Sequence, residues 1–254
     1  MYGAKTKIAF MLPSSCTVFE QEFLAITAGL DGVIGLPTRL LIEDTGTAGL
    51  SAMNDGIDLA ARQLATTGPD VVVYMCTAGS FKDGQDGNEA IKDRLRDITG
   101  CDQVTTTSEA VVDAIHHLRL DSVVMLTPYT EDITRREVDF LAYHDVTVTD
   151  YHYRDIEDNL DRGTIPLEES RRYALELDHA SADGVFLSCA NVPALDVIEP
   201  LEERTGKPVV TSTQATVWKS LRLAGVADAV PGYGSLLADN GRCRRRKIDV
   251  GGRS

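Results

Sequence analysis

A repeated pattern of strand and cysteine constrains the fold of this chain more than any other feature. Residues 70–76 read Asp-Val-Val-Val-Tyr-Met-Cys, and residues 183–189 read Asp-Gly-Val-Phe-Leu-Ser-Cys. Short continuous apolar runs of this kind are typical of strands that are buried on both faces of a parallel sheet. We therefore expect two equivalent buried strands, with Cys76 at the carboxyl end of one and Cys189 at the carboxyl end of the other.

Two further markers recur in the same order and at nearly constant offsets. A proline follows an apolar strand pattern at Pro13 and again at Pro128, and a glycine precedes a short strand and a helical pattern at Gly100 and at Gly206. Alternating strand and helix patterns indicate βαβ units and parallel sheets. The chain is predicted to be an α/β protein of two similar lobes, each a parallel sheet flanked by helices, related by a pseudo-twofold axis.

The active site is expected in the cleft between these lobes, because open α/β sheets bind ligands beyond the carboxyl ends of their strands. The markers place the first lobe at residues 1–105 together with 214–240, and the second lobe at residues 106–213. The segment 241–254, which contains a run of arginines, is predicted to be a disordered basic tail.

Composition argues against several classes of protein. The net charge of −14 argues against general binding to nucleic acid, which requires a basic surface. No apolar run approaches the roughly 20 residues that span a membrane, and no secretory signal is recognisable, so a cytoplasmic protein is expected. The 5 cysteines lack the spacing of a disulfide scaffold or a zinc site, and the histidines share no spacing. Free thiols and no metal are therefore predicted.

Small residues follow each of the two repeated cysteines. Residues 77–80 (Thr-Ala-Gly-Ser) follow Cys76, and residues 190–193 (Ala-Asn-Val-Pro) follow Cys189, so a turn is expected after each thiol. Backbone amides at a strand-to-helix junction can hold a carboxylate, and their positive field lowers the pKa of a nearby thiol. A single cysteine is more often a small buried apolar residue, but the equivalence of the two positions favours a reactive pair.

Four segments resemble one known superfamily. They are residues 76–81 (Cys-Thr-Ala-Gly-Ser-Phe), 187–190 (Leu-Ser-Cys-Ala), 207–212 (Lys-Pro-Val-Val-Thr-Ser) and 231–234 (Pro-Gly-Tyr-Gly). Together they are similar to the aspartate/glutamate racemase superfamily, in the branch of maleate cis-trans isomerases and arylmalonate decarboxylases. The resemblance implies that a decarboxylase would keep only the second cysteine, whereas isomerases and racemases keep both, as this chain does.

Two shorter motifs favour the isomerases within that branch. Residues 13–16 (Pro-Ser-Ser-Cys) are similar to an isomerase pattern Pro-Ser-Ser-Asn, and residues 158–160 resemble a motif whose asparagine contacts a substrate carboxylate. Two positions depart from the family pattern: Cys16 stands where an isomerase has a substrate-binding asparagine, and Ala78 stands where a serine is expected. Cys16 is then either a third thiol in the pocket or a small residue beside a different substrate.

The resemblance implies an isomerase that converts maleate to fumarate, or acts on a similar small carboxylate, without a cofactor. Cys76 would be the nucleophile that adds to an alkene carbon, and Cys189 would protonate the neighbouring carbon. A homodimer is also implied, with no nucleic-acid or membrane partner. The residues expected to bind the substrate are Pro13, Ser14, Ser15, Cys16, Thr77, Ala78, Tyr129, Thr130, Asn159, Ala190 and Asn191.

Three alternatives would use the same fold differently. A racemase of a small carboxylate or hydantoin-like compound would remove an α-proton with one thiolate and return a proton from the opposite thiol. A decarboxylase would act on a malonate-type acid. A two-lobed binding protein for small molecules would carry the same cysteines as buried residues without a chemical role.

Overall fold

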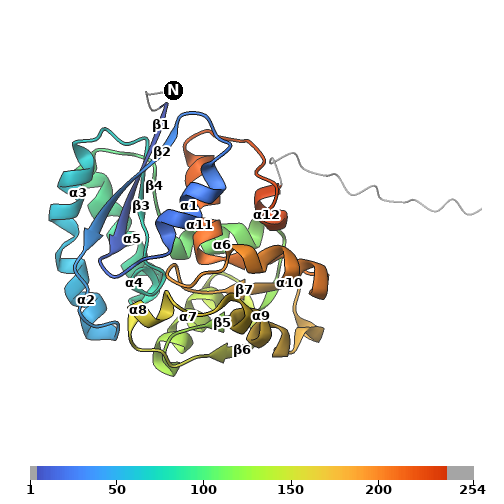
Figure 1. The fold of residues 1–254 in the computed structure, drawn as a ribbon. Coiled ribbons are helices and arrows are strands. Elements are labelled where there is room, and N and C mark those ends of the chain that lie inside the picture. Colours follow the sequence, from blue (N-terminus) through green and yellow to red (C-terminus); the bar gives the residue numbers. More distant parts are fainter. Residues whose placement is uncertain (1–4, 239–254) are drawn as a thin grey trace, which may run out of the picture.

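Two parallel sheets, one in each half of the chain, form the framework of the molecule (Figure 1). The computed structural model describes residues 5–238, so the predicted tail at 241–254 lies outside the described residues. The first sheet has the strand order β2-β1-β3-β4, and the second has the order β6-β5-β7-β8. All the paired strands run parallel. The predicted α/β fold of two similar lobes is confirmed.

Strands and helices alternate along both halves of the chain. The strands are β1 (Thr6–Pro13), β2 (Val33–Leu40), β3 (Val71–Tyr74), β4 (Val104–Thr106), β5 (Ser122–Thr127), β6 (Thr147–Tyr153), β7 (Gly184–Leu187) and β8 (Val209–Thr211). The α-helices are α1 (Phe19–Thr27), α2 (Thr47–Asp55), α3 (Ile57–Ala65), α4 (Thr77–Phe81), α5 (Gly84–Thr99), α6 (Thr107–His117), α7 (Glu131–Tyr143), α8 (Asn159–Arg162), α9 (Leu167–Glu176), α10 (Ile198–Thr205), α11 (Ser212–Leu223) and α12 (Gly234–Ala238). Two 3₁₀ turns are η1 (His179–Ser181) and η2 (Leu195–Val197). Among residues 5–238, no helix is both long and apolar enough to cross a lipid bilayer.

Strands β3 and β7 occupy equivalent inner positions in their sheets. Every residue of both strands is buried, as their continuous apolar sequences predict. The edge strands β2 and β6 instead consist mainly of exposed and half-buried residues. Complete burial of a valine or leucine side chain contributes about 1.5–3 kcal/mol, so the backbone that leads to each repeated cysteine is firmly held in the core.

Helices α6 and α11 join the two halves at the centre of the molecule (Figure 1). Each begins directly after a threonine whose hydroxyl caps it: Thr106 accepts a hydrogen bond from the Glu109 amide, and Thr211 accepts one from the Gln214 amide. Such a cap typically contributes about 1 kcal/mol. The two helices pack against each other, and α11 also contacts β3 and β4 of the first sheet. The division of the lobes at particular residues stays a prediction.

The repeated glycines have the same structural role in both halves. Gly100 follows α5 and Gly206 follows α10, with φ angles of 67° and 69° respectively. The amide of each donates a hydrogen bond back to a carbonyl of the last helical turn. A residue with a side chain is strained in this left-handed conformation, which explains why glycine marks the same point in both copies.

The segment after Cys76 differs from the expected turn. Residues Thr77–Phe81 form the short helix α4 directly after the thiol. The Cys76 side chain caps this helix, because its Sγ accepts a hydrogen bond from the Gly79 amide at 3.3 Å. The sequence pattern identified the strand and the cysteine, but it did not reveal that the thiol itself starts the next helix.

Candidate active site

The two repeated thiols lie just beyond the equivalent strands β3 and β7. The Sγ atom of Cys76 accepts a hydrogen bond from the Gly79 amide, and the Sγ atom of Cys189 accepts one from the Asn191 amide at 3.4 Å. Both side chains are buried, with exposures of 8% and 7%. Cys189 also acts electrostatically on Cys76 and raises the pKa of that thiol.

A small cavity of about 30 Å³ lies beside Cys76 and is lined from both halves of the chain. Its volume is close to that of a single water molecule, so the lining segments must move apart before a dicarboxylate can enter. Nine of the predicted site residues line it: Pro13, Cys16, Cys76, Thr77, Ala78, Tyr129, Asn159, Ala190 and Asn191. The cavity is also lined by residues that the sequence analysis missed, namely Ile42, Thr45, Leu50, Met75 and Arg162.

Three of the predicted binding residues hold neighbouring segments and do not line the cavity. The Ser14 hydroxyl accepts a hydrogen bond from the Ile42 amide at 3.1 Å. The Ser15 hydroxyl accepts one from Nδ2 of Asn159 at 2.8 Å. Thr130 precedes α7 as its N-cap residue. These residues position the wall of the cavity instead of forming it.

Cys189 also lies outside the lining set, although its neighbours belong to it. Ala190 and Asn191, which follow it directly, both line the cavity. The phenol of Tyr129, another lining residue, forms a hydrogen bond with the Cys189 thiol and thereby lowers its pKa. Cys189 is thus linked to the lining of the cavity by the Tyr129 phenol and by Ala190, which follows it in the chain.

Burial dominates the acidity of the thiols. It raises the pKa of Cys76 to about 12 and that of Cys16 to about 11, and it raises the pKa of Cys189 as well. The Gly79 amide lowers the pKa of Cys76, but this effect is smaller than desolvation of the thiolate. The backbone amides thus lower the pKa of the thiols in the expected direction, but burial outweighs them and keeps the pKa of each thiol above its ordinary value.

The two predicted asparagines connect segments that are far apart in the sequence. Oδ1 of Asn191 accepts a hydrogen bond from the Thr17 amide at 2.8 Å, and Nδ2 of Asn191 donates one to the Asn159 carbonyl at 2.6 Å. Asn159 in turn contacts Ser15. These bonds join the segment after β1 to the segments after β6 and β7, where the carboxyl ends of the two sheets meet.

Polar groups of the cavity are available for a ligand. Thr77 Oγ1 is buried and has no hydrogen-bond partner in the described part of the chain. Leaving such a hydroxyl unpaired is unfavourable, so its position favours a polar ligand in the cavity. Cys16, by contrast, donates its thiol proton to the Ala190 carbonyl, with a sulfur–oxygen distance of 3.8 Å.

Arg162 is a charged lining residue that sequence reasoning missed. It ends α8, and its guanidinium carbon lies 5.1 Å from the centre of the Tyr129 ring. Its positive charge lowers the pKa of both Cys76 and Cys189. A sequence signal was present, because residues three apart on a helix share a face and Arg162 follows Asn159 by that spacing.

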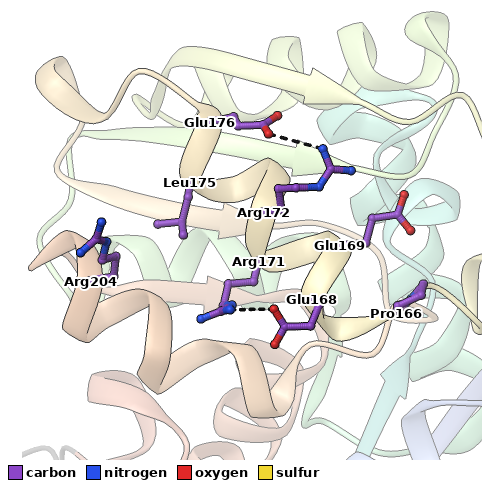
Figure 2. A pocket seen from close by; sticks show the side chains of 8 residues that line it. All are labelled: Pro166, Glu168, Glu169, Arg171, Arg172, Leu175, Glu176 and Arg204. Carbon is purple, nitrogen blue, oxygen red and sulfur yellow. Dashed lines mark hydrogen bonds and ion pairs between the residues drawn. The ribbon is translucent and has the colours of Figure 1, made fainter.

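A larger hollow of about 900 Å³ is lined by residues of α9, by Pro166 and by Arg204 of α10, and by neither thiol (Figure 2). Its charged side chains neutralise one another: Arg171 pairs with Glu168 at 2.6 Å, and Arg172 pairs with Glu176 at 3.4 Å. Exposed pairs of this kind are worth little and leave no net charge for a ligand. The cavity beside Cys76 is therefore the better candidate for the active site.

Comparisons with known proteins find relatives over most of the chain. Maleate isomerase from Nocardia farcinica is 27% identical over 238 residues, which cover 91% of this chain and 95% of that protein. Arylmalonate decarboxylase from Bordetella bronchiseptica is 33% identical over 198 residues, which cover 76% of this chain and 81% of that protein.

A solved structure of the Nocardia farcinica maleate cis-trans isomerase is similar to the whole fold. It has a TM-score of 0.88 and 25% identity, and covers 92% of this chain and 98% of that chain. That protein is a cysteine-to-serine mutant with a covalently bound succinylcysteine intermediate. These relatives confirm the branch that the sequence motifs indicated.

One protein family matches most of the described residues. The match extends over residues 36–237, which include both repeated cysteines, Tyr129 and Arg162. The family is described as arylmalonate decarboxylase. This chain therefore belongs to the arylmalonate decarboxylase family.

Proposed function

We propose that this chain is a cofactor-independent isomerase that converts maleate to fumarate. The observation that carries the proposal is the pair of buried thiols after equivalent strands: Cys76 lines the cavity, and Cys189 directly precedes the lining residue Ala190. The relatives named maleate isomerase support it, as does the succinylcysteine intermediate in one of their structures. A bond between a cysteine and a four-carbon diacid is the adduct that this pair would form.

The reaction requires temporary loss of the double bond. The Cys76 thiolate adds to one alkene carbon, so that a carbon–sulfur bond forms and the π bond breaks. The Cys189 thiol gives its proton to the neighbouring carbon, which leaves a succinyl adduct on Cys76 and a thiolate at Cys189. After rotation about the new single bond, Cys189 takes a proton back, the carbon–sulfur bond breaks, and fumarate leaves.

Fixed hydrogen-bond donors lower the energy of the step in which negative charge develops. Addition of the thiolate places charge on the carbon next to a carboxylate, and this charge spreads onto the carboxylate oxygens. The unpartnered Thr77 hydroxyl lies in the cavity to receive it, and the Tyr129 phenol lies beside Cys189. Donors that are already in place stabilise such charge without reorganisation during the reaction.

The presence of Cys76 distinguishes this proposal from decarboxylation. The family resemblance implies that a decarboxylase would keep only the cysteine at position 189, so it would have no use for a second buried thiol. Racemisation uses two thiols as well, but it needs a substrate with an acidic α-hydrogen. Both alternatives are separated from isomerisation by the experiment that follows.

Proton NMR of the purified protein with maleate in deuterated water tests the proposal. We expect fumarate to form with the wild type, and the rate to fall by about 10³-fold or more in both Cys76→Ser and Cys189→Ser. Cys101→Ser is a matched control, since Cys101 is also buried but does not line the cavity, and it should keep the wild-type rate. Absence of fumarate from the folded wild type would exclude maleate isomerisation.

The assembly and location of the protein belong to the same proposal. We expect a homodimer in the cytoplasm, with a first lobe of residues 1–105 and 214–240 and a second lobe of residues 106–213. Light scattering during size-exclusion chromatography measures the molecular mass in solution and so tests the homodimer. A mass equal to one chain would contradict the dimer, and it would leave the proposed chemistry untouched because both thiols come from one chain.

A further inference from the structure

Arg162 carries a buried positive charge that no carboxylate neutralises among residues 5–238. The residue is only 4% exposed, yet its hydrogen bonds in the described structure go to uncharged oxygen atoms. Lys82 and Lys92 are similarly buried, and each pairs with a carboxylate. An unpaired buried charge is strongly unfavourable, so the environment of Arg162 indicates that its partner is a ligand.

The contacts of Arg162 fix the guanidinium but leave part of it unused. Nε donates to the Ile156 carbonyl at 2.9 Å, and Nη2 donates to Thr45 Oγ1 at 3.0 Å and to the Glu157 carbonyl at 3.4 Å. Nη1 has no hydrogen-bond acceptor in the part of the chain that the structure describes. Its two N–H groups are therefore available to a ligand, in a position set by the other two nitrogens.

The surroundings of Arg162 match a carboxylate ligand. Arg162, Thr77 and Cys76 line the same cavity, and the Thr77 hydroxyl is itself buried without a partner. A carboxylate offers two acceptor oxygens, which suit a guanidinium nitrogen and a hydroxyl together. Two donors without acceptors, close to the proposed nucleophile, thus have complementary chemistry to one end of an acidic substrate.

We propose that Arg162 binds one carboxylate of the substrate and makes this site selective for dicarboxylates over the matching diamides. The inference deepens the proposed function by naming the residue that selects the substrate class. It also accounts for Cys16, which has no amide group at the position where the isomerases have a substrate-binding asparagine. Arg162 supplies the missing donor from the opposite half of the chain.

The expected selectivity is large because the arginine stays buried whichever ligand is bound. A dicarboxylate neutralises Arg162, whereas a diamide has no carboxylate and leaves the charge unpaired in either orientation. Unpaired buried partners of this kind reduce affinity by roughly 100-fold or more. A residue that served only to hold the loop around Ile156 would instead affect both ligands equally.

Equilibrium binding of two unreactive ligands tests this inference independently of catalysis. Succinate and its diamide, succinamide, have no double bond, so their binding does not depend on thiol addition. We expect calorimetry to show that the wild type prefers succinate by roughly 100-fold, and that Arg162→Met loses this preference by weakening succinate alone. Arg162→Lys keeps the charge without the fork of donors and should retain part of the preference.

Arg154→Met is the matched control. Arg154 lies in the same half of the chain, is largely buried, pairs with Glu169, and does not line the cavity beside Cys76. It should keep the wild-type ratio of succinate to succinamide affinity. Equal affinities in the wild type, no binding of succinate by the folded wild type, or an equal loss for both ligands in Arg162→Met would each overturn the inference.

The two proposals can fail separately. If succinate binds selectively through Arg162 but maleate is not converted, the reaction is wrong and the dicarboxylate site stands. If fumarate forms but Arg162→Met discriminates as the wild type does, the reaction stands and the role of Arg162 is wrong. Should Arg162→Met fail to fold, the wild-type ratio and the Arg162→Lys ratio still decide the outcome.

Discussion

Ser188 donates a hydrogen bond of 2.6 Å to Oε1 of Glu137, and both side chains are buried. The other carboxylate oxygen of Glu137 has no hydrogen-bond partner within residues 5–238. Burial raises the pKa of Glu137 to about 8, although the hydrogen bond from Ser188 opposes this shift. Since Ser188 directly precedes Cys189, a carboxyl group that is protonated at neutral pH supports the backbone beside one of the two thiols.

Glu137→Gln is expected to remove a pH-dependent loss of stability. The pKa of Glu137 is about 8 in the folded protein, whereas a glutamate in the unfolded chain has the ordinary pKa of 4.5, so the folded state holds a proton that the unfolded state has lost. Stability is therefore fully present below about pH 4.5 and decreases as pH rises toward 8, by up to about 1.4 kcal/mol per pH unit. The glutamine variant lacks this slope.

Urea unfolding at several pH values between about 5 and about 8 measures the difference between the two proteins. Glu131→Gln, on the exposed start of the same helix, is the control and should keep the wild-type slope. Parallel stability curves for wild type and Glu137→Gln would show that Glu137 is already ionised in the fold.

The backbone conformations of the two repeated cysteines predict opposite effects of glycine. Cys189 has a φ angle of 94°, a conformation that side chains rarely adopt, whereas Cys76 has a φ angle of −147°. We expect Cys189→Gly to be more stable than Cys189→Ala by about 1 kcal/mol, because glycine relieves the strain. At Cys76 the order should reverse, since glycine only adds flexibility to the unfolded chain there.

Urea unfolding of the glycine and alanine variants at Cys189 and at Cys76 measures these differences. The two variants at each position remove the same thiol, so their comparison isolates the effect of the backbone. If alanine is the more stable substitution at both positions, Cys189 is not strained by its backbone. Strain at this point has a functional interpretation, because conformations of this kind are concentrated at active sites, where the surrounding structure enforces them.

The acidity of Cys76 predicts how the isomerase rate depends on pH. Burial raises the pKa of this thiol to about 12, so only a small fraction is thiolate near neutral pH. Since kcat/KM reports the ionisation of the free enzyme, we expect kcat/KM for maleate to rise about tenfold per pH unit between about pH 7 and about pH 9. Cys16→Ser should retain this slope. A flat profile would mean that another group has already taken the proton from Cys76.

The fold could be predicted because its strands and helix ends are encoded in short local stretches of sequence. The apolar runs before Cys76 and Cys189 had to be buried strands, and glycines such as Gly100 had to end helices where the backbone is left-handed. Parallel strands end at the same edge of a sheet, so two thiols at equivalent strand ends were expected to meet at one cleft. Repetition made each of these local inferences more secure.

The parts of the site that the sequence did not reveal depend on contacts across the fold. Arg162 lines the cavity together with Thr45, which is far away in the sequence and accepts a hydrogen bond from its guanidinium group. The thiol pKa values depend on burial, which no motif around Cys76 records, and burial outweighed the effect of the nearby amide. Residue type and spacing therefore located the site, while its charge and acidity required the assembled structure.

Asn191 provides the last prediction, because its side chain links the two halves of the chain at the cavity. Asn191→Ala leaves the buried Asn159 carbonyl and the Thr17 amide without their present partners. Leaving such groups unpaired costs about 1–3 kcal/mol, so we expect a loss of about 2 kcal/mol in the free energy of unfolding. Thr17→Ala removes only a longer bond of 3.4 Å from an exposed hydroxyl and should change stability by less than about 0.5 kcal/mol. Urea unfolding of both variants decides the matter, since equal and small losses would mean that Asn191 does not hold the two halves together.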